Sequence, residues 1–123
     1  MAAVANEARS VGERYFDAWT SGDFDTARAL VHNDLTFCGP FETFRRADEF
    51  FESLRRVGGG LLERAEKKRM FADGEDVCII YDFVAHEPVG ASPTVEWYRV
   101  RDGKIAEIQI VFDTRPFAAL RQE

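Results

Sequence analysis

The chain has 123 residues, 46% of them hydrophobic and 13% aromatic, and its formal net charge at pH 7 is -6. This length and apolar content are those of one globular domain with a real core, so a disordered chain is excluded and we expect a single domain over residues 1–123. The acidic balance argues against nucleic acid as the main partner, because phosphate binding needs a concentrated basic surface.

The cysteines and the first residues of the chain indicate a cytoplasmic protein. Cys38 and Cys78 have no histidine at metal-site spacing, and we expect them to be free, buried thiols in a reducing compartment. Residues 1–6 lack the apolar stretch of a signal peptide, and no segment has the length of a membrane span. With no glycine-rich phosphate loop either, we expect no metal, no cofactor and no membrane partner.

The first half of the chain has the apolar spacing of helices. A helix is predicted from Glu7 to Thr20, ended by Gly22, which adopts the left-handed capping conformation without a Cβ clash. Asp23 is placed to cap a second, short helix that runs to Val31. A short strand over Leu35–Gly39 follows, and then a third helix over Ala47–Val57.

The second half changes to the alternation of strands. Four strands are predicted, over Leu61–Ala72, Val77–His86, Thr94–Arg101 and Lys104–Asp113. Asp102-Gly103 lies between the last two and is a strong hairpin signal, because both turn positions need positive φ. Helices followed by a long antiparallel meander predict an α+β fold and not a parallel α/β fold.

Five short motifs occur in a characteristic order: Arg14–Phe16, Ser21–Phe24, His32–Phe37, Trp97–Ile105 and Phe112-Asp113. Together they resemble the nuclear transport factor 2-like superfamily, which includes the SnoaL-like polyketide cyclases, and the resemblance covers nearly the whole chain. It implies a cone in which a curved mixed or antiparallel sheet, as in cystatin-like folds, wraps the N-terminal helices around a pocket. Members include isomerases, epoxide hydrolases, cyclases and noncatalytic proteins, so the fold does not name the function.

Strand alternation decides which side chains face such a pocket. On the last strand, hydrophobicity selects the face that carries Ile110. On the other two strands the pattern leaves open whether Asp82 or Tyr81, and whether Glu96 or Trp97, points inward. The resemblance implies that both acids lie inside. Aligned with ketosteroid isomerases, Tyr15 and Glu96 match the oxyanion-binding tyrosine and acid, and aligned with limonene epoxide hydrolases, Asp82 matches a pocket aspartate.

Neither catalytic group is complete in this chain. The proton-shuttling aspartate of the isomerases aligns with Gly39. The partner arginine of the hydrolases aligns with Ile80, and their second aspartate with Ile110. The resemblance therefore does not assign either the isomerase or the hydrolase activity to this chain.

The remaining residues still suggest proton-transfer chemistry. We expect Tyr15 and a protonated Glu96 to bind a carbonyl or enolate oxygen, with Asp82 as the base. The alternatives are a core role for Tyr15, and an Asp82 that faces outward and pairs with a basic side chain. The expected ligand-binding walls are Trp19, Phe37, Phe41, Phe50, Val84, Tyr98, Ile110 and Phe112.

The sequence therefore predicts a protein that binds a small hydrophobic organic molecule. Catalysis of the isomerase, hydrolase or cyclase type is one hypothesis, and a noncatalytic ligand-binding protein of the same fold is the alternative. A protein-interaction module is a third class, which buried acids do not favour because their burial is costly. We also expect a homodimer through the outer sheet face, where Trp97, Arg99, Gln109 and Val111 are the candidates.

Overall fold

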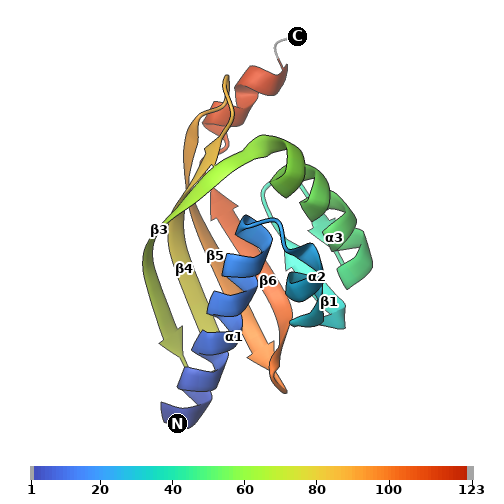
Figure 1. Ribbon diagram of the computed structural model, residues 1–123, viewed down its shortest axis with the longest axis vertical. Helices are drawn as coiled ribbons and strands as arrows, with labels where there is room; N and C mark the ends of the chain where they lie inside the picture. The colour runs from blue at the N-terminus through green and yellow to red at the C-terminus, as the bar shows by residue number, and fades with distance from the viewer. Residues whose placement is uncertain (1, 122–123) are drawn as a thin grey trace.

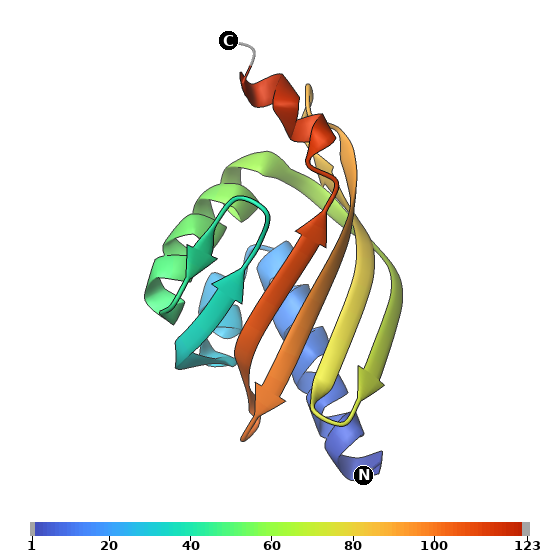
Figure 2. The same cartoon turned by 180° about the vertical axis from the view of Figure 1, so that it is seen from behind.

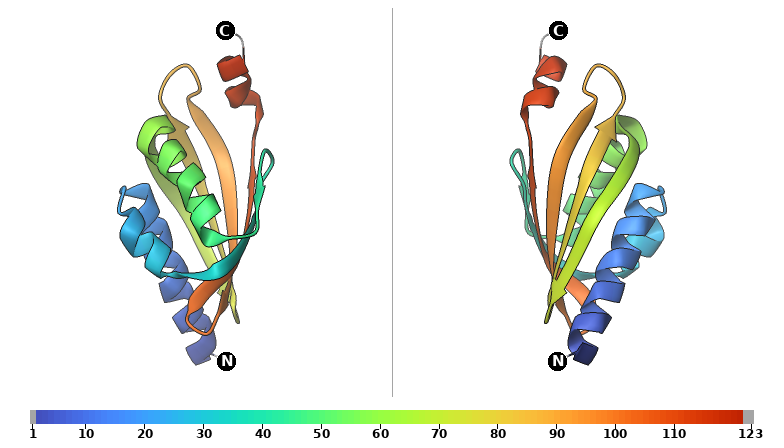
Figure 3. Two further views of the ribbon diagram at one scale, coloured as in Figure 1. Left: turned by 90° about the vertical axis from the view of Figure 1, so that its right-hand side faces the viewer. Right: turned by 90° about the vertical axis from the view of Figure 1, so that its left-hand side faces the viewer.

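The computed structural model describes residues 2–121, which form a six-stranded sheet with helices packed on one of its faces (Figure 1). Seen from the side, sheet and helices diverge toward one end, so the molecule is a cone (Figure 3). The element order is that of an α+β fold, and the predicted fold class is confirmed. Within the described residues, none of the helices is both long and apolar enough to cross a membrane.

The helices come from the first half of the chain: α1 spans Ala2–Thr20, α2 spans Phe24–Ala29 and α3 spans Ala47–Arg56. Asp23 caps α2 as predicted, because its carboxylate accepts a hydrogen bond from Thr26 N at 3.2 Å. α1 begins before the predicted Glu7, and α2 ends before the predicted Val31. α3 continues through the glycines as a π-helical turn, η1, over Val57–Leu61.

The strands are β1 (Val31–Cys38), β2 (Thr43–Phe44), β3 (Leu62–Asp73), β4 (Asp76–Ala85), β5 (Ala91–Arg101) and β6 (Lys104–Phe112). Their order in the sheet is β2-β1-β6-β5-β4-β3. β1 runs parallel to β6 and all other neighbours are antiparallel, so the sheet is mixed. The predicted hairpin between β5 and β6 is confirmed, with φ of 53° at Asp102 and 76° at Gly103.

The alternation of buried residues fixes which faces of β4 and β5 meet the helices. On β4 every second residue from Val77 to Ala85 is buried, so Tyr81 faces the helices and Asp82 faces the opposite way. On β5 the buried series includes Glu96, whereas Trp97 is exposed. The strand pattern in the sequence left both choices open. In the structure Glu96 faces the helices and Asp82 faces away from them.

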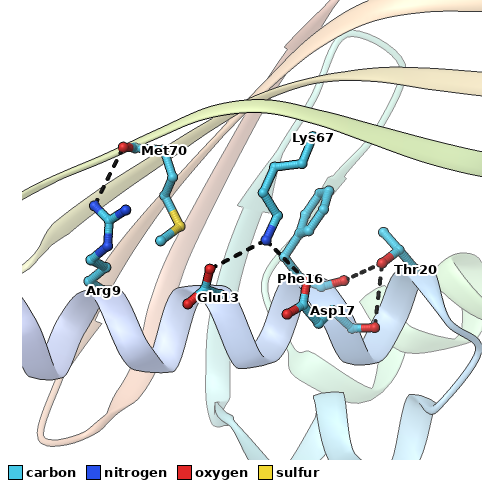
Figure 4. A network of polar contacts seen from close by, with 7 residues as sticks. All are labelled: Arg9, Glu13, Phe16, Asp17, Thr20, Lys67 and Met70. Carbon is cyan, nitrogen blue, oxygen red and sulfur yellow. Dashed lines mark hydrogen bonds and ion pairs between the residues drawn. The ribbon is translucent and has the colours of Figure 1, made fainter.

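Several contacts hold α1 against the sheet, and two of them show how it is placed. Its close approach is at Gly12, where an added Cβ would lie only 2.8 Å from Cγ1 of Val77. Toward the edge strand β3, Lys67 Nζ lies 3.2 Å from Asp17 Oδ1 and 3.5 Å from Glu13 Oε2 (Figure 4). The helix therefore packs closely against β4 at Gly12, and an exposed ion-pair cluster links it to β3.

The chain continues after β6 in a short 3-10 helix, η2, over Arg115–Arg121, which the sequence analysis did not predict. It lies at the wide end of the cone (Figure 2). The Asp113 carboxylate accepts hydrogen bonds from the backbone and the side chain of Arg115, and Ser92 Oγ donates to Asp113 O at 2.7 Å. These bonds hold the exit from β6.

Within residues 2–121, no helix covers the outer face of β4, β5 and β6 (Figure 2). Trp97 and Val111 lie there with 42% and 58% of their surface exposed. Both cysteines are free, but Cys38 is exposed and Cys78 is half-buried, so the prediction of buried thiols is wrong. The strand alternation that buries Val77 and Ile79 turns Cys78 to the uncovered face.

Candidate functional site: a cavity with one buried carboxyl

A cavity of about 610 Å³ lies between the helices and the inner face of the sheet. Its lining comes from α1, from β1, β2 and their connection, from α3 and η1, and from the inner faces of β4, β5 and β6. η2 adds Phe117 and Leu120. A volume of this size is typical of sites for small organic molecules, which are roughly 300–1,000 Å³.

Aromatic side chains make up much of the wall. Six of the predicted wall residues line the cavity: Trp19, Phe37, Phe41, Phe50, Ile110 and Phe112. Phe37 and Phe50 are stacked, with ring centroids 4.4 Å apart, which joins β1 to α3. The cavity is thus suited to burying flat apolar surface, although the role of these residues in binding stays a prediction.

Two of the predicted wall residues lie elsewhere. Val84 is on the outer face of β4, because it alternates with the buried Phe83 and Ala85. Tyr98 faces inward but is fully buried in the core and is not part of the wall. Its hydroxyl instead supports the polar group described next.

Glu96 is the buried carboxyl of the cavity, with 3% of its surface exposed. Its two oxygens each accept one tyrosine hydroxyl: Tyr81 Oη donates to Oε2 and Tyr98 Oη donates to Oε1, both at 2.5 Å. Glu96 pairs with Ile79 in the β4–β5 register, which places Tyr81, two residues further along β4, on the same face.

The pKa of Glu96 is raised from 4.5 to about 7, because the effect of burial outweighs the hydrogen bonds from Tyr81 and Tyr98, which lower it. The pKa values of both tyrosines lie well above 10, because burial and the neighbouring Glu96 charge disfavour a phenolate. The hydroxyls therefore keep their protons, and Glu96 is the group of this cluster that titrates near neutrality.

Tyr15 lies beside this cluster but is not one of its two hydrogen-bonding hydroxyls. It lines the cavity and packs edge-on against Tyr98, with ring centroids 5.1 Å apart. Burial raises the pKa of Tyr15 well above 10, and the charge of Glu96 raises it further. The structure thus brings Tyr15 and Glu96 to the same cavity, with Tyr81 as the partner that the sequence analysis missed.

The placement of Asp82 inside the pocket is wrong. Asp82 lies on the outer face of β4, outside the cavity wall, and its Oδ2 is 3.1 Å from Lys68 Nζ on β3. This is the alternative in which the acid faces outward and pairs with a basic side chain. With Asp82 on the far side of the sheet, it cannot serve as the base of a reaction in the cavity.

Gly39 lines the cavity where the resemblance placed the isomerase base. A Cβ added there would lie 2.8 Å from Cγ2 of Ile110 and 3.2 Å from the Phe37 ring. The chain therefore lacks the base, and the side chains of Ile110 and Phe37 occupy the space that an acid at position 39 would need.

Two further polar features belong to residues that line the cavity. Ser53 Oγ donates to Glu42 Oε2 at 2.8 Å, and both residues line the cavity. The indole Nε1–H of Trp19 is buried and has no hydrogen-bond partner among the described residues. No sequence pattern signals an unpartnered donor, because the absence of a partner depends on the packing around it.

Among the residues that the structure describes, no group of three or more His, Cys, Asp or Glu side chains could hold a metal ion. The chemistry available from these side chains is hydrogen bonding and proton transfer around Glu96.

Solved structures share this architecture. A protein from Kribbella flavida is 29% identical to this chain over 92% of each chain, with a TM-score of 0.85. A nuclear transport factor 2-like protein from Cytophaga hutchinsonii is 21% identical over 90% of this chain and 94% of its own, with a TM-score of 0.77. An LEH-like epoxide hydrolase from M. tuberculosis is 24% identical over 95% of this chain and 96% of its own, also with a TM-score of 0.77.

At these identities the last two comparisons show the fold alone. None of the curated protein sequences compared with the chain matches it. The sequence profile of the SnoaL-like domain family matches residues 12–108, a stretch that reaches from α1 into β6 and includes the Glu96 cluster. The chain therefore belongs to the SnoaL-like domain family and has the nuclear transport factor 2-like fold.

Proposed function

We propose that this protein binds a small, largely apolar molecule whose hydroxyl or other hydrogen-bond donor meets Glu96. The observation that carries the proposal is a carboxyl buried in the wall of an aromatic cavity and bonded by two tyrosine hydroxyls. The chain bears a substantial cost for burying an ionisable group there, whereas an apolar side chain of similar size would fill the space without that cost.

The hydrogen-bond inventory defines the ligand group. When Glu96 is ionised, Tyr81 and Tyr98 both direct their hydroxyl protons to its oxygens. The carboxylate then offers only its remaining lone pairs, so it selects a ligand that donates. The aromatic wall supplies affinity for the rest of the molecule, at about 25 cal/mol per Å² of apolar surface buried.

The binding experiment compares 2-naphthol with 2-methoxynaphthalene by isothermal titration calorimetry at pH 8. We expect the wild type to prefer 2-naphthol, and Glu96→Gln to lose that preference by about tenfold, since hydrogen bonds to charged groups contribute about 1.5–3 kcal/mol. Asp82→Asn is the matched control, because it changes an acid on the outer face and should leave both affinities unchanged. Equal affinity of wild type and Glu96→Gln for 2-naphthol, or no binding to either, would refute the proposal.

Proton transfer by Glu96 is a second candidate function. It is favoured by the pKa of about 7, because a general acid or base works best when its pKa lies near the working pH. With Asp82 outside and Gly39 in place of an acid, the described cavity wall offers Glu96 as its one buried carboxyl. Such a group typically contributes about 10²–10⁴ in rate.

Deuterium uptake at the α-carbon of 2-tetralone in D₂O, followed by proton NMR, tests this second function. Glu96 would accept the carbon-bound proton to give the enolate, and exchange of its carboxyl proton with solvent would return a deuteron. We expect uptake faster than in buffer with the wild type and at the buffer rate with Glu96→Gln. Uptake at the buffer rate with the wild type would leave the protein a binder of small molecules.

We also propose a homodimer through the outer sheet face. The support is the exposure of Trp97 and Val111 on strands that no described helix covers. Size-exclusion chromatography with light scattering at micromolar concentration should give the dimer mass, and Val111→Asp should give the monomer. A monomer mass for the wild type would refute the dimer proposal.

A further inference from the structure

The wall of the cavity reaches the surface of the protein at a rim of exposed residues. They come from the β1–β2 connection, from the end of α3 with η1, and from η2, and they are Pro40, Phe41, Glu42, Arg56, Gly60 and Leu120. The C-terminal end of α3 and η2 both lie toward the wide end of the cone (Figure 3). A Cβ added at Gly60 would enter open space, so the cavity is accessible beside η1.

Arg56 is the last residue of α3 and the one basic residue among the described residues that line the cavity. It follows Ser53 by three residues, which places the two on the same side of the helix, and Ser53 lines the cavity as well. Arg56 is exposed, so its guanidinium is open to solvent and to a ligand that enters the cavity. The rim thus carries one cation.

The protein does not use this cation for a contact of its own. Within the described part of the chain, the Arg56 side chain makes no hydrogen bond, ion pair or ring contact. Its neighbour Arg55 gives the contrast, because Arg55 is not part of the cavity wall and its Nη2 lies 3.6 Å from Asp25 Oδ1. The acid of the rim, Glu42, accepts its hydrogen bond from Ser53 Oγ. The donors of Arg56 are therefore available to an acceptor from outside the protein.

The chemistry of the two ends of the cavity differs in sign. A guanidinium has five N–H donors in a planar fork, which matches the two oxygens of a carboxylate. Glu96 lies buried in the same cavity, and an anionic group of a ligand placed beside its carboxylate would be repelled strongly in a medium of low dielectric constant. An acidic group of a ligand is thus stable at the rim and unstable beside Glu96, which orients the molecule.

We propose that Arg56 binds a carboxylate group of the ligand at the rim of the cavity. The inference rests on the proposed binding function and narrows its ligand class to organic acids. The apolar frame of the acid occupies the aromatic cavity, its hydrogen-bond donor meets Glu96, and its carboxylate stays at the surface beside Arg56. Arg56 is then a specificity-determining residue and takes no part in proton transfer.

The test compares acids with their primary amides, which have nearly the same shape and no charge. The probes are 6-hydroxy-2-naphthoic acid and its homologues with one or two methylene groups between the ring and the carboxyl group, so that the reach to Arg56 varies. Isothermal titration calorimetry at pH 8 measures each affinity. At low ionic strength we expect at least one acid to bind about 2- to 5-fold more tightly than its amide, as an exposed ion pair implies. In 1 M NaCl this preference should vanish.

Arg56→Gln should remove the preference for the acid, whereas Arg55→Gln, the matched change one residue earlier on the same helix, should preserve it. Both side chains are exposed, so neither substitution disturbs the core. If the wild type binds every acid no more tightly than its amide, or if Arg56→Gln keeps the preference, the assignment of Arg56 is overturned. The Glu96 proposal then still stands as long as 2-naphthol binds. Failure of 2-naphthol and of all the acids and amides to bind overturns both.

Discussion

Replacing Glu96 by glutamine should change how the stability of the protein depends on pH. The pKa of Glu96 is about 7 in the folded protein against 4.5 ordinarily, so between these values the folded chain holds a proton that the unfolded chain has released. Stability therefore falls as pH rises through this window and is constant above it. At about 1.36 kcal/mol per pKa unit, the loss contributed by Glu96 is about 3 kcal/mol between pH 4.5 and pH 8.

Glutamine has the shape of the protonated acid and does not titrate. We expect Glu96→Gln to match the wild type within about 1 kcal/mol near pH 4.5 and to exceed it by about 3 kcal/mol at pH 8. Urea unfolding followed by circular dichroism at pH 4.5, 5.5, 6.5, 7.5 and 8.5 measures this difference. All other titrating groups are common to both proteins and cancel. A difference that stays flat across the series would show that Glu96 does not take up its proton on folding, and the argument from burial would be refuted.

Three further outcomes follow from single contacts. Tyr81→Phe removes a hydrogen bond that lowers the pKa of Glu96, so the Glu96 carboxyl should titrate above pH 7 in a ¹³C NMR titration, and an unchanged midpoint would contradict this. Lys67→Met breaks the exposed ion pairs with Glu13 and Asp17 and should lower the free energy of unfolding by less than about 1 kcal/mol. In 1 M NaCl the difference should vanish, and a larger loss that salt does not change would contradict this prediction. Gly39→Asp should lower the free energy of unfolding by about 1–3 kcal/mol through overpacking against Ile110. In a chain that already carries Ile110→Ala the same substitution should be less destabilising. If urea unfolding shows that the effects of the two substitutions simply add, the contact is contradicted.

The fold could be predicted because its signals are local. Helical spacing ends at Gly22, Asp23 caps the next helix, and Asp102-Gly103 marks the last hairpin, and each of these acts within a few residues. The boundaries moved by a few residues where pairing or packing extends an element. β1, for example, begins at Val31 because it pairs there with Ile105 of β6.

The site was only partly predictable, because contacts between strands decide which side chains face the cavity. Both faces of β4 are apolar enough to be buried, so alternation could not choose between Asp82 and Tyr81. The family comparison then placed both acids inside, which holds for Glu96 and fails for Asp82, where Lys68 on the neighbouring strand compensates the charge. Tyr81 became recognisable as a partner of Glu96 only through the β4–β5 register.

The contact between Gly39 and Ile110 constrains how this chain can diverge. An acid at position 39 meets the Ile110 side chain at 2.8 Å, so the substitution is costly unless Ile110 has already been shortened. Shortening Ile110 alone opens a void beside Gly39 and is costly in its turn. Each change is thus unfavourable without the other, and a stepwise mutational path toward an acid at this position passes through a less stable intermediate. A laboratory selection that mutates positions 39 and 110 together is the direct way across that barrier.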